Sequence, residues 1–290
     1  MNHCYCGRDF TPADLAAIGN LMVDNPDANR ATLSRLVCER IDWRRPDGRL
    51  KDMSCRVAML RMQDDGLLLL PEPRWGNGNG KRYQRRTAAA EPELLSVTTP
   101  AGQIEGLHLE PVVGRGDASH LWNEYIDRYH YLGYQPLPGA QMRYVARNGD
   151  GQLLALLGFG AAAWKAAPRD DFIGWTPPQR KQRLHLVVNN ARFLILPWVT
   201  SRNLASTLLA KVARQLPADW DRHYGHRPVI LETFVEIPRF RGTCYKAANW
   251  IHVGDTQGRG KLDRFHEAAL PRKSIWVLPL VRNFRRKLCD

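Results

Sequence analysis

Apolar side chains recur at helical spacing in three segments at the start of the chain. In the first segment Leu15 and Ile18 share one face, and Thr11 with Asp14 supplies an N-cap and an acidic residue at N3. The pattern predicts helices over about 11–24, 30–41 and 51–64. The inward-facing apolar residues expected in the third helix are Met53, Val57, Met59 and Leu60.

A further apolar run, 67–71, follows the turn Asp65-Gly66 and predicts a short buried strand. Three short helices followed by a β element are the outline of a winged helix-turn-helix. In that arrangement the third helix enters the major groove and the wing or linker touches phosphate. The alternative is a helical module that binds another protein.

Beyond residue 100 the pattern alternates between strand and helix periods. It predicts strands over 107–112, 140–147, 152–162, 185–196, 229–236, 251–255 and 275–280, and helices over 118–132, 202–216 and 242–249. We therefore expect an α+β chain in three parts. These are a winged-helix-like DNA-binding domain at 8–73, a basic and polar linker at 74–100, and a mixed α/β domain at 101–290.

The composition is that of an ordinary globular protein, with 44% hydrophobic residues among 290. No apolar run approaches the roughly 20 residues that span a bilayer, and the N-terminus has no apolar signal segment, so we expect a cytoplasmic protein without membrane contact. The six cysteines form no disulfide pattern. Cys4 and Cys6 lack a second close pair that would complete a metal site, so we predict no metal.

Net charge points to a polyanionic partner. The chain has 42 basic and 29 acidic residues, which gives +13. The bases cluster, so nucleic acid is favoured over a merely solubilising surface. The predicted DNA contacts are Lys51, Arg56 and Arg61 on the third helix, and Lys81, Arg82, Arg85 and Arg86 on a basic arm.

Several strings in the chain resemble the Druantia anti-phage DruA family, whose members also occur near transposons. They are YHYLGY at 129–134, RDDFIGW at 169–175, VNNARFLILP at 188–197, ETFV at 232–235 and GTCY at 242–245. The resemblance covers both the helical and the α/β part. It implies an anti-phage or mobile-element protein that works with DNA and with other proteins of a defence complex.

The order of elements in the α/β part also resembles the GNAT acetyltransferases, and 243–254 looks like their tyrosine-bearing helix and following strand. That resemblance implies coenzyme A or an acyl-CoA as a cofactor, bound where a strand leads into a helix N-terminus. The corresponding loop, 198–206, lacks the usual glycines. Its candidate phosphate ligands are Ser201, Arg202, Asn203 and Ser206. A DNA phosphate could take the same position, and Ser201 could be only an N-cap.

Three residues are candidates for catalysis, each with a structural alternative. Glu232 lies within an apolar strand, so it is either a general base or half of an ion pair, for example with Arg192. Tyr245, through the acetyltransferase resemblance, would protonate the leaving thiolate; the alternative is a core tyrosine. His130 is either a proton-transfer residue or structural.

A polar insertion between the predicted strands 152–162 and 185–196 combines aromatic and basic residues. Arg169, Trp175 and Arg180 in it would suit a flipped base or a single strand, whereas core packing would explain the tryptophans equally well. Arg259 and Lys261 form a basic turn that adds two possible nucleic-acid contacts.

Three functional hypotheses follow from these features. The first is an acyltransferase-like enzyme that acts on DNA, with Glu232 as base and Tyr245 as acid. The second is a non-catalytic DNA-recognition subunit of a defence complex. The third is a transposase-like or nuclease-like protein that processes DNA strands, for which the sequence has no metal-binding carboxylate cluster.

Overall fold

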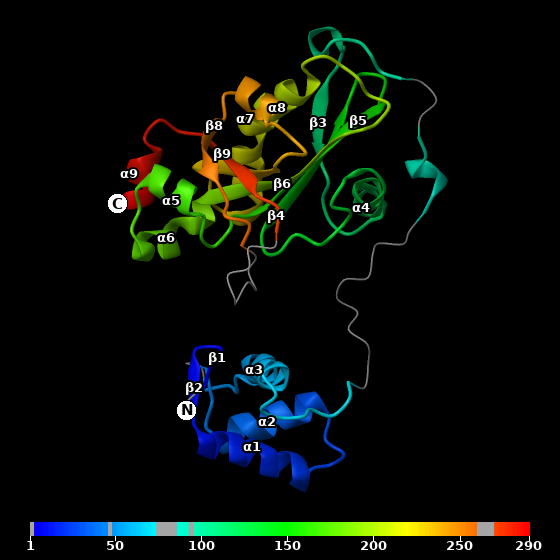
Figure 1. Ribbon diagram of the computed structural model, residues 1–290. Coiled ribbons are helices and arrows are strands. Elements are labelled where there is room, and N and C mark those ends of the chain that lie inside the picture. The colour runs from blue at the N-terminus through cyan, green and yellow to red at the C-terminus, as the bar shows by residue number, and fades with distance from the viewer. Residues whose placement is uncertain (1–2, 46–47, 74–85, 93–95, 260–269) are drawn as a thin grey trace. The chain divides into compact units, whose positions relative to one another are not determined.

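The computed structural model describes residues 3–45, 48–73, 86–92, 96–259 and 270–290. The chain divides into two compact units, Met1–Gly80 and Lys81–Asp290, which we call the head and the body (Figure 1). Helices and strands occur in both units, as expected for an α+β chain.

The head contains a hairpin and three helices. Its elements are β1 (His3–Tyr5), β2 (Arg8–Phe10), α1 (Pro12–Asp24), α2 (Arg30–Arg40) and α3 (Asp52–Asp64). Thr11 begins α1 as predicted, since its side chain accepts the Asp14 N–H while the Asp14 carboxylate accepts the Thr11 N–H. All three predicted helices are confirmed to within a residue or two.

The expected strand after α3 is wrong, because residues 67–70 pair with no strand in the described part of the chain. This run is held by side chains instead: Gln63 accepts the Leu70 N–H, and Leu70 is buried while Leu69 is 82% exposed. The strands of the head precede its helices and form a hairpin that the apolar pattern did not predict. The winged-helix arrangement therefore lacks its wing at the predicted place.

The inward face of α3 also differs from the prediction. Cys55, Ala58, Met59 and Met62 are buried, at the i, i+3, i+4, i+7 spacing of a helix face. Met53 and Val57 lie off that face and are 54% and 40% exposed. An apolar pair is thus presented to solvent on the helix predicted to read DNA.

The body is built around a seven-stranded sheet. Its strands are β3 (His108–Pro111), β4 (Gln141–Arg147), β5 (Leu153–Ala161), β6 (Val187–Ile195), β7 (Ile230–Glu236), β8 (Ile251–Asp255) and β9 (Lys273–Pro279). Their order is β3-β4-β5-β6-β7-β9-β8, and β6 with β7 is the one parallel pair among the strands described. The predicted strands are confirmed, and β6 is central.

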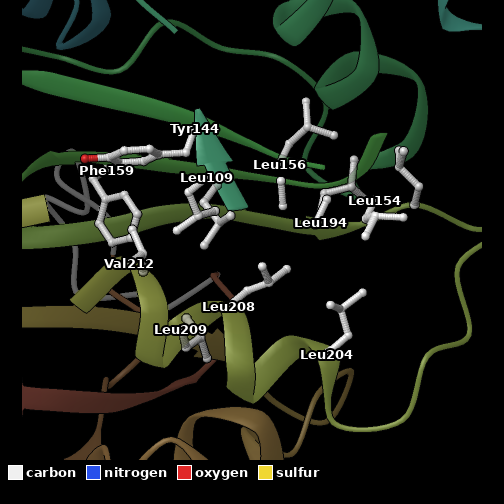
Figure 2. Packing of buried hydrophobic residues seen from close by; sticks show 14 of the residues in the cluster. Leu109, Tyr144, Leu154, Leu156, Phe159, Leu194, Leu204, Leu208, Leu209 and Val212 are labelled. Atoms are coloured by element: carbon white, nitrogen blue, oxygen red, sulfur yellow. The ribbon is translucent and has the colours of Figure 1, made fainter. Parts of the chain in front are cut away.

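The three helices predicted for the body are present: α4 (Asp117–Tyr129), α7 (Leu204–Tyr224) and α8 (Thr243–Ala247). α7 extends eight residues beyond the predicted end at 216 and contains Pro217. Figure 2 shows Leu204 and Leu208 of α7 directed toward the strands. Both side chains are buried, so α7 is fixed against one face of the sheet by apolar contacts.

Part of the predicted linker belongs to the body. The short 3-10 helix η1 (Ala88–Ala90) packs on α4, and Ala90 is fully buried. The hydroxyls of Tyr125 and Tyr129 donate to the carbonyls of Ala89 and Ala90 at 3.0 and 2.8 Å. These hydrogen bonds from side chains to backbone carbonyls hold residues 88–90 against α4, whereas the alanine-rich composition had predicted a linker here.

The insertion after β5 forms two short helices, α5 (Ala167–Ile173) and α6 (Pro177–Arg183), and the basic C-terminal stretch forms α9 (Phe284–Cys289). None of the three was predicted, because each is too short for a clear apolar period. Across the described ranges, no helix combines the length and apolar character needed to cross a membrane. The same ranges contain no group of three His, Cys, Asp or Glu residues that could hold a metal ion.

Candidate functional site

The parallel pair β6 and β7 opens shortly after it begins. The register holds for three pairs, Val187–Ile230 to Asn189–Glu232, although the strands continue to Ile195 and Glu236. At the next position the Thr233 hydroxyl donates to the Asn190 carbonyl at 3.0 Å. Ligands of open α/β sheets bind beyond the carboxyl ends of parallel strands, so this opening is the candidate site.

Tyr245 of α8 lies at the opening. Its hydroxyl donates to Asn190 Oδ1 at 2.8 Å and lies 3.5 Å from Thr233 Oγ1. Its ring packs edge-on against Trp250 with centroids 5.1 Å apart. Burial raises the pKa of the Tyr245 phenol well above its ordinary value. The phenol is therefore a protonated donor whose hydrogen already has an acceptor.

Glu232 projects from the opposite face of β7, because successive strand residues alternate between faces and Thr233 contacts Tyr245. It is fully buried. Arg169 Nη1 donates to Oε2 at 2.7 Å and the Ala163 N–H donates to Oε1 at 2.9 Å. Burial raises the pKa of the Glu232 carboxyl, and the Arg169 guanidinium opposes that rise.

This geometry favours the ion-pair alternative for Glu232 over the general base. Both carboxylate oxygens already accept hydrogen bonds. The partner is Arg169 rather than the suggested Arg192, because the insertion folds α5 over this face of β7. Glu232 and Tyr245 thus point away from each other, and a ligand would have to pass through the opening to touch both.

The insertion residues form a buried network with Glu232. Arg169 is fully buried, donates to Asp170 at 2.8 Å and lies 5.5 Å from the Trp175 ring. Asp170 also accepts from Trp175 Nε1 at 3.0 Å and from Arg180 at 3.1 Å. The side chains of Arg169 and Trp175 are enclosed by this network, and their contact with nucleic acid stays a prediction. Arg180 is turned inward, with its guanidinium 5.6 Å from the ring of Trp164.

His130 ends α4 and is held by its own turn. Its Nδ1 accepts the Leu132 N–H at 3.2 Å, and its ring lies 4.8 Å from that of Tyr131. Burial lowers the pKa of His130 to about 4, and the positive charge of Arg192 adds to this effect. The imidazole is therefore neutral near pH 7. Because Nδ1 accepts, the proton lies on Nε2, which makes that atom a hydrogen-bond donor.

The loop between β6 and α7 carries the predicted cofactor ligands. Asn203 occupies the N-cap with φ of 64° and provides no side-chain cap. The Ser201 hydroxyl is buried and has no hydrogen-bond partner among the described residues, and the Arg202 side chain is exposed. Ser206 donates its hydroxyl to the Asn203 carbonyl at 3.0 Å, so its proton is used within the turn.

The remaining predicted nucleic-acid residues are scattered. Lys51, Arg56 and Arg61 are half-exposed on the head, and Arg56 lies 3.8 Å from Asp52. Arg86 pairs with Asp127 of α4 at 2.9 Å, so it is fixed to the body. Arg259 is exposed after β8. The predictions for Lys81, Arg82, Arg85 and Lys261 fall outside the described residues.

Comparisons with known proteins give one family and a set of structures. The family model described as Druantia protein DruA matches residues 61–270. No curated protein matches the chain.

Among solved structures, the chain is similar to spermidine/spermine N-acetyltransferase SpeG from Vibrio cholerae in complex with manganese ions, with 12% identity and a TM-score of 0.39 over 62% of this chain and 96% of that one. It is also similar to the same organism's spermidine N-acetyltransferase with CoA and spermine, with 12% identity and a TM-score of 0.38 over 60% and 95% of the two chains.

Proposed function

The chain belongs to the Druantia protein DruA family, and from this membership we propose that it is a DNA-binding defence protein whose body takes an acyl-CoA at the opening between β6 and β7. The observation that carries the proposal is that β6, which forms one side of this opening, continues through the loop 196–203 into the 21-residue helix α7, whose N-terminus has no side-chain cap among the described residues. An uncapped helix start presents unpaired N–H groups and a positive dipole end to an anion.

The residues present fit a phosphate group. Ser201 has a buried hydroxyl for which the described part of the chain provides no hydrogen-bond partner, and Arg202 has an exposed guanidinium beside the same helix start. Two such groups next to unpaired amides would hold a pyrophosphate without the glycine-rich loop that the sequence lacks. When bound, an acyl-CoA would supply an activated acyl group at the opening.

Tyr245 is the residue placed to hold a proton there. It is protonated and at the opening, so it would have to exchange its Asn190 acceptor for a ligand atom. Glu232 would serve to keep α5 on the sheet rather than to move protons. His130 would offer a neutral N–H donor to the other face of the opening.

The nucleic-acid part of the proposal rests on charge and on α3. The net charge of +13 favours a polyanion, and α3 exposes Met53 and Val57 near Arg56. A helix that combines apolar and basic groups on its outer face can contact thymine methyl groups and phosphates together. Sequence-dependent duplex binding by the head is therefore the expected mode.

The test is thermal stabilisation of the full chain by coenzyme A and acetyl-CoA. We expect a rise in Tm that shrinks in Ser201→Ala and Arg202→Ala, whereas Arg222→Ala, whose side chain is 76% exposed on the far end of α7, should keep it. No stabilisation of the wild type would overturn the coenzyme part of the proposal.

A second candidate is the non-catalytic DNA-recognition subunit. It is favoured by the hydrogen bonds that already occupy both Glu232 oxygens and the Tyr245 hydroxyl. Under this alternative, duplex DNA would bind and stabilise the chain while coenzyme A and acetyl-CoA would have no effect on Tm.

A further inference from the structure

A β-bulge in β6 turns Arg192 toward the α4 side of the sheet. The register between β5 and β6 shifts so that Phe159 faces Asn190 and Gly158 faces Arg192, with Ala191 as the extra residue. In a regular strand residues i and i+2 lie on the same face, so without the bulge Arg192 would share the face of Asn190 and Tyr245. Bulges of this kind redirect a side chain and are frequent beside functional sites.

Gly158 makes room for this arrangement. A Cβ at Gly158 would lie 3.0 Å from the Trp122 ring of α4 and 3.2 Å from Arg192 Cβ. The absence of a side chain therefore lets Trp122 and Arg192 meet on one face of the sheet. The bulge sets the face of the sheet on which the Arg192 side chain lies, and Gly158 leaves the space for it there.

Arg192 has no acidic partner among the residues that the structure describes. One guanidinium nitrogen donates to the Ala191 carbonyl at 2.7 Å, and within the described ranges its buried Nε has no hydrogen-bond partner. Burial lowers the pKa of the Arg192 guanidinium. A partly buried cation without a counter-charge is costly, and an anionic ligand would remove that cost.

The surroundings of Arg192 are aromatic and include a neutral donor. Its charge acts on both His130 and Tyr131, so the three side chains lie within electrostatic reach. Tyr131 and Phe240 are 37% and 46% exposed and meet edge-on with centroids 5.2 Å apart. Arg239 lies 5.0 Å from the Tyr131 ring and pairs with Glu236 at 3.0 Å, which neutralises that acid.

From this juxtaposition we infer that the Arg192 side of the opening is a nucleotide-binding site. The phosphate would pair with the Arg192 guanidinium and accept the His130 Nε2–H, and the base would stack on Tyr131 and Phe240. The site takes either a free nucleotide or one nucleotide of a single strand. The inference rests on the nucleic-acid part of the proposed function and does not need coenzyme A.

Titration calorimetry of the full chain tests the nucleotide-binding site with four probes. These are inorganic phosphate, dAMP, a twelve-nucleotide single strand of DNA and a duplex of the same length. We expect the wild type to bind dAMP and the single strand more tightly than phosphate. Tighter binding of dAMP identifies a free nucleotide as the ligand, and tighter binding of the strand identifies single-stranded DNA.

Two variants locate the site, and a third is the matched control. Arg192→Gln should weaken dAMP and single-strand binding by about tenfold or more and lower the salt slope for the strand by about 1. Phe240→Ala removes an exposed ring, so folding is preserved, and single-strand affinity should fall by about fivefold or more. Arg222→Gln removes an exposed positive charge elsewhere and should bind as the wild type does.

The outcomes separate this inference from the proposed function. Duplex binding without binding of dAMP or the single strand would overturn the nucleotide site and leave DNA binding intact. Wild-type affinity in Phe240→Ala, or equal affinity for phosphate and dAMP, would overturn the stacked base. If none of the four probes binds, both the inference and the nucleic-acid part of the proposed function fail.

Discussion

The Glu232 carboxylate accepts a 2.7 Å hydrogen bond from Arg169, and neither side chain is exposed to solvent. The pair connects the centre of the sheet to α5, since Arg169 lies within that helix. Two ions removed from water are stabilised only by each other and by their hydrogen bonds. Glu232, the first residue of the string ETFV at 232–235, therefore has a structural role in this fold.

We predict that Glu232→Gln lowers the free energy of unfolding by roughly 3 kcal/mol, because it leaves the buried Arg169 charge compensated by Asp170 alone. Arg169→Met alone should cost a similar amount, since it strands the Glu232 carboxylate. The double variant should be more stable than the sum of the two losses implies. Chemical denaturation of the four proteins measures this coupling, and strict additivity would contradict it.

The strand and helix order could be predicted from apolar periodicity, because long elements bury one face consistently. The hairpin β1–β2 and the helices α5, α6 and α9 were missed because three to seven residues show no clear period. The candidate site was harder to predict than the fold. Pairing between Glu232 and Arg169 spans 63 residues, and no spacing in the sequence indicates it.

Arg192 shows why the candidate site was only partly predicted. The string VNNARFLILP was recognised, but its register was not, and a single bulge decides which face each side chain takes. Tyr245 could be singled out through the acetyltransferase resemblance, and His130 because histidine is the residue most easily poised for proton transfer near pH 7. Their protonation depends on burial, which only the fold provides.

Tyr245→Phe should lower the free energy of unfolding by about 1–2 kcal/mol, since it leaves the buried Asn190 Oδ1 without its donor. If Tyr245 also supplies a proton, protection against phage should be lost in the same variant. Tyr129→Phe is the control, because it removes a hydroxyl that bonds Ala90 away from the opening. Full protection with Tyr245→Phe would end the catalytic assignment.

Changing Lys51, Arg56 and Arg61 together to Gln should weaken duplex binding by at least tenfold and reduce the salt slope by about 2–3. The reason is that each lost phosphate contact releases about one counterion fewer. A control with Arg222 and Arg227 changed to Gln removes exposed charge from the body only. Equal affinities of the two multiple variants, measured by fluorescence anisotropy, would remove α3 from the DNA interface.

The buried, neutral imidazole of His130 makes the free energy of unfolding depend on pH. In the unfolded chain the imidazole takes a proton below about pH 6.5, whereas burial and the charge of Arg192 hold its folded pKa at about 4. Between these values the unfolded state binds more protons, so the stability due to this residue is full above pH 6.5 and is lost as the pH falls toward 4. The loss should be about 2 kcal/mol, allowing for screening of a partly exposed ring.

His130→Gln isolates this effect, since glutamine stays neutral. The difference in unfolding free energy between wild type and variant should be greatest at pH 7–8 and should shrink by about 2 kcal/mol by pH 4.5. His108 is the opposite control: the Gly106 carbonyl and Glu110 raise the pKa of His108, so its contribution is full at low pH and is lost as the pH rises. A pH-independent difference for His130→Gln would show that folding does not lower the pKa of His130, and the imidazole would then take up its proton over the same pH range as in the unfolded chain.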